Sequence, residues 1–444
     1  MTDDAQGSGE KLSLRTKIGF ATGNLEEAMV LAASATTLIF YNQVMGLPLA
    51  LCGTAFLIGS MVDAISDPLV GAFSDSIRTR FGRRHPLMFC SAFPIGIFFY
   101  FLYQPPSGLE ENQLFYWYVA MYVGLNLSKT FYGVPHSALG AELSRDYNER
   151  TKLFGWNWVA YYLGAAVLPI FIMSVIFASS DEFENGLLNA ERYQMLATVG
   201  AVFVTSMVLL CTFLTADRIP YLHEVKKNSG GAKRSFAEAT IDTLKNLWAL
   251  ATNISYVSIS ICWLILFISG GVLAQAGTYT HLYVFEFSTE ILGYLGLMGL
   301  PGAFLVVYSS AWFVKRLDKK YTVLVTSSVC SLLIGLPYCL RLMGWLPDND
   351  SVWMLPMIIA IWIPGRFFLP IVPTVIDSQM SDIADEHELR TGNRSEGIIF
   401  SVRTFGMKAT RGIGGWIGAM ALDYIGFPED AKAETLEPEV ISGL

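Results

Sequence analysis

Two aspartates stand inside an apolar stretch of the sequence. Asp63 and Asp67 occur in VDAISDPLVG, within a run that begins near Leu47 and ends near Phe73. Four residues apart on a helix, they share one face. Each bare charge costs about 2.5–3.5 kcal/mol at mid-membrane, and the two repel each other. A bound Na⁺ or Li⁺, with Ser66 as a further oxygen ligand, resolves both problems, as does a proton on one carboxylate. The alternative is a buried salt bridge to a basic residue elsewhere.

The composition indicates that this stretch belongs to a membrane protein. The 444 residues are 53% hydrophobic and 15% charged, whereas soluble domains carry about 25% charged residues. Mean hydropathy is +0.44, and apolar runs long enough to cross a bilayer as helices recur along the chain. We find no nucleophile motif, phosphate-binding loop or His/Cys metal spacing. The sequence therefore predicts a polytopic α-helical membrane protein that is not an enzyme and carries no cofactor.

Apolar runs and loops predict eleven membrane-spanning helices. The predicted spans are 18–45, 48–74, 86–104, 114–142, 154–178, 194–216, 252–283, 289–314, 321–345, 351–382 and 396–427. A flexible basic stretch, KKNSGGAKRS, separates six spans from five. We expect an N-terminal helix bundle at 1–216, a cytoplasmic linker at 217–250 and a C-terminal bundle at 251–444.

The two halves also resemble each other. Acidic residues followed by Arg come before the next helix in both ELSRDYNERTKL and QMSDIADEHELRTGNRSEG. This repeat predicts two six-helix bundles related by a pseudo-twofold axis, with the last helix absent from this chain. Either the chain is cut before its twelfth helix or its C-terminus lies outside; we favour the cut.

Basic residues set the predicted orientation. Lys and Arg gather in alternate loops, for example at Arg83 and Arg84 and at Lys319 and Lys320, and the other loops are acidic or neutral. By the positive-inside rule the N-terminus is cytoplasmic. The expected surroundings are the lipid bilayer of the cytoplasmic (inner) membrane, and the expected partner is a small solute. We expect a monomer that binds no nucleic acid.

Three ordered motifs resemble one transporter family. DAISDPLVGAFSDSIRTRFGRRHP, GVPHSALGAELSRDYNERTKLFGW and LRTGNRSEGIIFSVRTFGMKAT are similar to the glycoside–pentoside–hexuronide:cation symporters, typified by melibiose permease. The resemblance spans both halves. It implies the major facilitator fold and symport of a sugar, glycoside or uronide with Na⁺ or H⁺ by alternating access between two bundles.

The resemblance also implies site residues. The family's cation site matches Asp63 and Asp67, with Ser66 in place of an Asn and with Thr130. Its sugar site matches Glu27, where the family has Asp, and Lys408, which links the sugar and cation sites.

Three positions depart from the family's sugar site. Its helix-four Asp and Trp fall on Gly133 and Ser137, and its helix-five Arg falls near Asn157 or Trp158. The galactoside pocket is therefore not reproduced. Trp158 is the best candidate for stacking on a sugar ring.

Further charges lie inside the predicted spans. Glu26 adjoins Glu27, and the remaining ones are basic: Arg366, Arg403, Lys408 and Arg411. Intramembrane charges usually have a function. Lys408 with Arg366 or Arg411 predicts a partly anionic solute. The alternative is internal pairing of the arginines with Asp377 or Glu396, or of the basic groups with the helix-one carboxylates.

The loop after the second span predicts a gate. Asp75, Arg83 and Arg84 lie in GAFSDSIRTRFGRRHP, a spaced form of the major-facilitator loop signature. The alternative is a simple positive anchor on the inside.

Two other functions stay open. One keeps the fold and carries a lysophospholipid with a cation, because YGVPHSAL loosely resembles such symporters. The other is a sensor of substrate, or a passive scramblase, that does not transport against a gradient. The aspartate pair argues against the latter, since a passive protein needs no cation site.

Overall fold

The chain is helical throughout the part that the structure describes. The computed structural model describes residues 12–77, 79–144, 146–180, 183, 185–220, 252–391, 396–428, 431 and 436–444. The chain divides into two compact units, residues 1–232 with 428–430 and residues 233–427 with 431–444. The predicted linker 217–250 lies outside the described residues from residue 221 onward.

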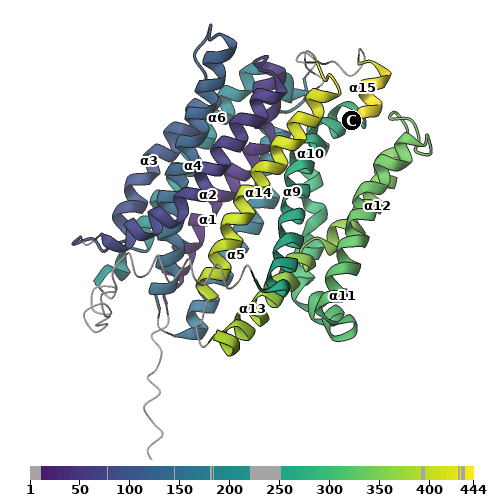
Figure 1. Ribbon diagram of the computed structural model, residues 1–444. Coiled ribbons are helices and arrows are strands. Elements are labelled where there is room, and N and C mark those ends of the chain that lie inside the picture. Colours follow the sequence, from purple (N-terminus) through teal and green to yellow (C-terminus); the bar gives the residue numbers. More distant parts are fainter. Residues whose placement is uncertain are drawn as a thin grey trace, which may run out of the picture. The chain divides into compact units, whose positions relative to one another are not determined.

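The first unit contains six long helices (Figure 1). They are α1 (Leu14–Ile39, continued by the π-helix η1, Phe40–Val44), α2 (Leu49–Ser76), α3 (His85–Leu102), α4 (Glu111–Glu142), α5 (Tyr147–Phe171, continued by η2, Ile172–Ile176) and α6 (Ala190–Leu214). Two short 3₁₀ helices, η3 (Gly186–Leu188) and η4 (Ala216–Arg218), flank α6.

The second unit is also helical. Its elements are α9 (Ile254–Tyr283), α10 (Thr289–Leu295), η5 (Gly296–Gly299), α11 (Leu300–Leu342), α12 (Met354–Phe368), α13 (Ile371–Thr391), α14 (Glu396–Tyr424) and α15 (Pro438–Gly443). Each of the eleven predicted spans therefore corresponds to helix in the described part of the chain.

The predicted break between the spans 289–314 and 321–345 occurs inside α11. Asp318 there has φ 64° and ψ 163°, which is not helical. Its carboxylate accepts a hydrogen bond from the backbone N–H of Lys319 (2.7 Å). This combination of φ and ψ is essentially confined to glycine, so the backbone at Asp318 is strained where the two helical segments meet.

The predicted span 351–382 corresponds to one apolar stretch, Met354–Ile383, that is long enough to cross a membrane. The structure has two helices there, α12 and α13, separated at Leu369 and Pro370. Proline has no N–H, and its ring clashes with the carbonyl four residues earlier, here that of Arg366. The Leu369 N–H bonds to the Arg366 carbonyl instead (3.3 Å).

The polarity of the helices separates them into two groups. Among the described residues, eight stretches are long and apolar enough to cross a membrane, and they lie in α2, α3, α5, α6 and α9–α13. The helices α1, α4 and α14 are not among them. These three carry Glu26, Lys129 and Lys408, respectively. Because intramembrane charge is expensive, the charged groups on these three helices are candidates for function, as are Asp63 and Asp67 on the more apolar α2.

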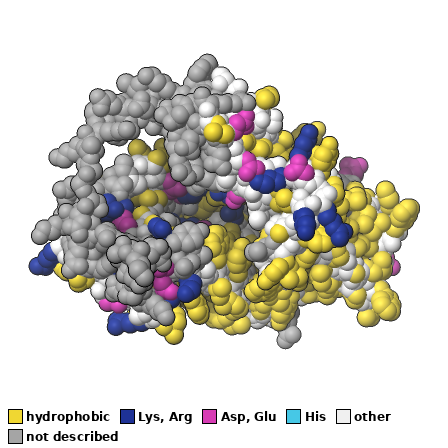
Figure 2. Space-filling model, turned by 90° about the horizontal axis from the view of Figure 1, so that it is seen from below, with side chains coloured by type: hydrophobic (Ala, Val, Ile, Leu, Met, Phe, Trp, Pro, Cys, Tyr) yellow, Lys and Arg dark blue, Asp and Glu magenta, His cyan; other side chains and the backbone are white. Residues whose placement is uncertain are grey.

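The outer surface of the first unit is apolar. On α3, Phe89, Phe93, Ile97 and Phe101 recur every four residues and are 41–52% exposed. The opposite face, with Ala92 for example, is buried. Figure 2, which views the molecule from below, shows hydrophobic side chains over its lower and right-hand parts, with Lys, Arg, Asp and Glu side chains nearer the middle. This pattern suits a helix bundle surrounded by lipid.

Candidate functional site

Oxygen atoms from α2 and α4 meet inside the first unit. The Thr130 hydroxyl donates to Asp63 Oδ1 (3.1 Å) and lies 3.1 Å from the Ser66 hydroxyl. Ser66 in turn donates to the Asp63 backbone carbonyl (3.0 Å). Ser66 and Thr130 are buried, and Asp63 is partly buried. The structure therefore brings together three of the four residues predicted to hold a cation.

Asp67 completes the predicted set from the next turn of α2. It is partly buried, like Asp63. Pro68 follows it inside the helix. Because proline lacks an N–H, the carbonyl of Ala64 loses its usual helical donor. The helix thus offers an additional backbone oxygen beside the two carboxylates.

Lys129 joins this cluster to α1, and sequence reasoning missed it. Its ammonium pairs with Glu27 Oε2 at 2.9 Å; the Lys129 side chain is 16% exposed and that of Glu27 is 48% exposed. The ammonium also interacts electrostatically with Glu26 and Asp63. The sequence does contain a signal for this residue. Lys129 is a charged residue in the middle of the predicted span 114–142, and its neighbour Thr130 was already assigned to the cation site.

Glu26 is the most deeply buried carboxyl group of the site. The residue is 2% exposed. Its Oε1 is buried and has no hydrogen-bond partner among the residues that the structure describes. Gly23, one turn earlier, permits close packing here: a Cβ on Gly23 would lie 2.1 Å from the Tyr132 hydroxyl and 2.7 Å from His136 Nε2. The side chains of Tyr132 and His136 therefore reach from α4 to the α1 backbone at this level.

The candidate sugar contacts lie on α4 and α5. Asn157 is buried, and its backbone carbonyl accepts from Asn24 Nδ2 of α1 (3.3 Å). Trp158 is 53% exposed and stacks on Tyr162 with ring centroids 5.8 Å apart. A Cβ on Gly133 would meet no atom within 4 Å. The position where the family has a carboxylate is therefore open space.

In the second unit, Arg403 has an internal partner. It donates from Nη2 to Asp377 Oδ2 (2.9 Å), its Nε lies 2.8 Å from Oδ1, and its guanidinium lies 4.6 Å from the centre of the Trp263 ring. Internal pairing with Asp377, one of the alternatives considered for this arginine, is thus observed.

Arg366 also lies among groups of its own unit. It donates to the Leu295 carbonyl (3.2 Å) and lies 5.7 Å from the Trp362 ring. These contacts come from α12 itself and the end of α10. Lys408 and Arg411 are on α14, where Lys408 is partly buried and Arg411 is exposed within the described chain.

The predicted gate residues bind the end of α4. Arg84 donates to Ser74 Oγ (2.7 Å) and Glu142 Oε1 (2.9 Å), and Arg83 pairs with the same Glu142 oxygen. These bonds connect the α2–α3 loop to α4 within the first unit. The side chain of Asp75 lies outside the described part of the chain. A role of this loop in gating stays a prediction.

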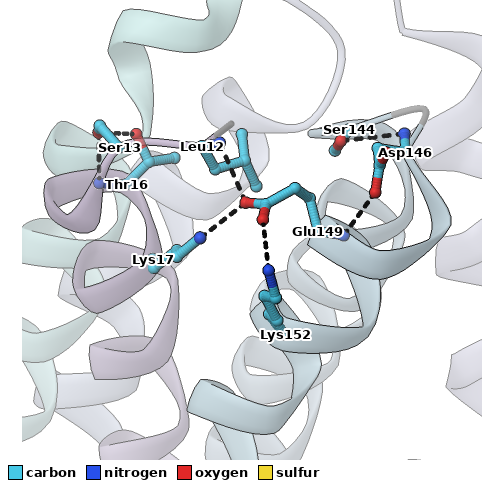
Figure 3. Close-up of polar contacts among 8 residues, drawn as sticks. All are labelled: Leu12, Ser13, Thr16, Lys17, Ser144, Asp146, Glu149 and Lys152. Atoms are coloured by element: carbon cyan, nitrogen blue, oxygen red, sulfur yellow. Dashed lines mark hydrogen bonds and ion pairs between the residues drawn. The ribbon is translucent and has the colours of Figure 1, made fainter. Parts of the chain in front are cut away.

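A second ionic cluster ties α1 to α5 (Figure 3). Glu149 accepts from the Leu12 backbone N–H (3.2 Å), and its oxygens lie 2.7 Å from Lys17 Nζ and 3.0 Å from Lys152 Nζ. Asp146 caps α5 by accepting from the Glu149 N–H (2.8 Å). The cluster thereby fixes the starts of two helices that both line the candidate site.

This cluster predicts a pH dependence of stability. Hydrogen bonds from Lys17 and then Lys152 lower the pKa of Glu149 from 4.5 to about 2. A carboxyl whose folded-state pKa is depressed stabilises the fold fully above its unfolded pKa and progressively less as the pH falls toward the folded pKa. We expect the thermal midpoint of the protein in detergent to fall as the pH is lowered from 4.5 to about 2. This fall should be smaller in Glu149→Gln. Glu111→Gln, at an exposed position, is the control and should leave the profile unchanged.

The fold and the site define a class of protein. Two helical units, with charged groups inside the bundle, are the architecture of a major facilitator transporter. The crystal structure of a D-xylose-proton symporter superposes with a TM-score of 0.60 at 14% identity, covering 97% of this chain and 93% of that one. The predicted fold class is therefore confirmed.

The chain belongs to the MFS/sugar transport protein family, whose profile matches residues 19–444. A "Putative glycoside/cation symporter YagG" of Escherichia coli (strain K12) is 27% identical over 438 residues, 96% of this chain and 86% of that protein. A "Glucuronide carrier protein homolog" of the same organism is 24% identical over 447 residues, 98% and 88% of the two chains. The protein is a multi-pass membrane transporter and not an enzyme, and the family resemblance is confirmed.

Proposed function

We propose that this cation-coupled symporter imports a glycoside-like sugar or a uronide across the cytoplasmic membrane with Na⁺ or H⁺. The observation that carries the proposal is the convergence of Asp63, Ser66 and Thr130 beside the Lys129–Glu27 pair. A cation or proton site that contacts a partly exposed carboxylate can link ion binding to solute binding. The glycoside and glucuronide names of the relatives support the same solute class.

The solute would bind where polar and aromatic groups surround open space. Glu27 and Asn157 supply hydrogen-bonding groups, Trp158 supplies an aromatic face, and Gly133 leaves room. Lys408 and Arg411, on α14, stay predicted contacts of the solute. Alternating access follows if the loaded and empty states favour closure while the half-loaded state does not.

The charge of the solute can be tested with a matched pair of sugars. We expect proteoliposomes to accumulate a methyl glucuronide more than the corresponding methyl glucoside, because Lys408 and Arg411 provide cations for the carboxylate. A hydrogen bond to a charged group contributes about 1.5–3 kcal/mol, so Arg411→Gln should reduce glucuronide uptake about tenfold or more. Glucoside uptake by the same variant is the control. Equal uptake of the two sugars, unaffected by Arg411→Gln, contradicts an anionic solute.

A groove in the first unit favours a second candidate, an amphiphile with one acyl chain. A cavity of about 500 Å³ lies between α1 and α5. Of its lining side chains only those of Thr22 and Trp156 carry a polar atom; the others are Ile18, Ala21, Leu25, Val159, Ala160, Leu163, Gly164, Val167 and Leu168. Sugar hydroxyls there would lack hydrogen-bond partners. Competition by a lysophospholipid against methyl glucuronide uptake tests this candidate, with a zwitterionic detergent of equal chain length as the control.

A further inference from the structure

The site already contains a positive charge where a coupling cation would be needed. Lys129 lies 2.9 Å from Glu27 and interacts with Glu26 and Asp63. It comes from α4, the same helix that supplies Thr130 to Asp63. Its side chain is 16% exposed, so water screens it little. A metal cation binding at Asp63 would have to approach this fixed ammonium and be repelled by it.

The neighbouring Glu26 is arranged to carry a proton. It is 2% exposed, and its Oε1 has no hydrogen-bond partner in the described chain. Burying a charged carboxylate without donors is costly, whereas the protonated group is neutral. Lys129 cannot satisfy Glu26, Glu27 and Asp63 equally, since it carries one charge against three carboxyl groups. One carboxyl group of this set therefore favours the protonated form, and Glu26 is the most buried.

Every neighbouring helix contributes to the surroundings of Glu26. Glu27 of α1 and Lys129 and Tyr132 of α4 interact with Glu26, and Lys129 also interacts with Asp63 of α2. His136 of α4 and Cys211 of α6 lie near Gly23, one turn before Glu26. Asn157 of α5 accepts from Asn24 through its backbone carbonyl. Lys129 supplies positive charge among these groups. Its direct ion pair is with Glu27, which is more exposed than Glu26. The polarity of the region is thus set by acids around one lysine.

We propose that Lys129 determines the ion selectivity of this transporter: it occupies the position of a coupling cation, excludes Na⁺, and leaves a proton on Glu26 as the coupled ion. The inference rests on the proposed symport. A hydronium ion protonates Glu26 Oε1: one O–H bond of the hydronium breaks, one O–H bond on Glu26 forms, and water leaves. While Glu26 is protonated, Lys129 pairs with Glu27. When Glu26 loses its proton, its carboxylate competes with Glu27 for Lys129, and the orientation that Glu27 presents to the solute changes.

Purified full-length protein in detergent tests the selectivity through its thermal midpoint. We expect NaCl and choline chloride at equal ionic strength to give the same midpoint for the wild type. Lys129→Gln should acquire a saturable upward shift with NaCl, because its carboxylates can then bind Na⁺ and a ligand stabilises the state that it binds. Lys129→Arg keeps the charge and should show no shift. Lys152→Gln removes an exposed lysine, 60% accessible, and controls for net charge.

Proteoliposomes separate this inference from the proposed symport. With methyl glucuronide and methyl glucoside as probes, a pH gradient without Na⁺ should drive accumulation, and a Na⁺ gradient at constant pH should not. A Na⁺-dependent rise in the wild-type midpoint, or accumulation driven by Na⁺ alone, overturns the role of Lys129 and leaves symport intact. Accumulation by neither gradient removes the symport proposal itself. The wild-type measurements decide the matter even if Lys129→Gln fails to fold.

Discussion

Replacing Asp63 and Asp67 by Asn, singly or together, should abolish gradient-driven accumulation of solute. Asn has nearly the shape of Asp but can neither balance a cation's charge nor carry a proton at neutral pH. The Thr130 hydroxyl can still donate to the amide oxygen at position 63, where it now donates to Asp63 Oδ1. The fold should therefore persist while coupling is lost. Proteoliposomes with an imposed ion gradient should fill only until the inside and outside solute concentrations are equal.

The matched control is Asp382→Asn. Asp382 is 60% exposed on α13 and pairs with Lys319. An exposed ion pair contributes about 0–1 kcal/mol, so this variant should accumulate solute as the wild type does. Downhill exchange of the solute should survive in all variants, because it needs no ion coupling. Normal accumulation by the Asp63→Asn/Asp67→Asn double variant would show that ion coupling does not require these two carboxylates.

Local sequence patterns were sufficient to locate the helices and the α2 site. Charges inside apolar runs predicted which helices have a function, and the four-residue spacing predicted that Asp63 and Asp67 share one face. Ser66 and Thr130, assigned through the family resemblance, do lie together in space, 3.1 Å apart. These features depend on residues close in the chain or on a known motif, so a single sequence contains the necessary information.

Pairing between distant helices could not be predicted in the same way. Lys129 and Glu27 are 102 positions apart, and only the packing of α1 against α4 shows that they form an ion pair. Arg403 had several acidic candidates, and the structure selects Asp377. The division at Pro370 was missed because the apolar stretch Met354–Ile383 continues across it. For the two ion pairs, the deciding interaction lies outside the local segment.

A close approach of α9 and α14 holds the helix that carries Lys408 and Arg411. A Cβ on Gly271 would lie 2.5 Å from the Arg411 carbonyl oxygen and 2.8 Å from the Gly415 backbone nitrogen. A Cβ on Gly414 would lie 2.1 Å from the Ile268 carbonyl oxygen. Small residues allow this contact between membrane helices, where dispersion and close packing stabilise association. Because α14 also carries Lys408, its position depends on these glycines.

Gly271→Ala should therefore destabilise the protein, while Gly270→Ala should not. The added methyl group at 271 meets backbone atoms that cannot rotate away, and overpacking of this kind costs about 1–3 kcal/mol. At Gly270 the same methyl group meets no atom within 4 Å, and Ala is favoured over Gly inside a helix by roughly 0.5–1 kcal/mol. The two thermal midpoints should thus move in opposite directions, and only Gly271→Ala should lower solute uptake, because α14 is displaced. Equal shifts of the thermal midpoint in the two variants would mean that α9 and α14 can move apart with little loss of free energy. Other interactions would then hold Lys408 in position.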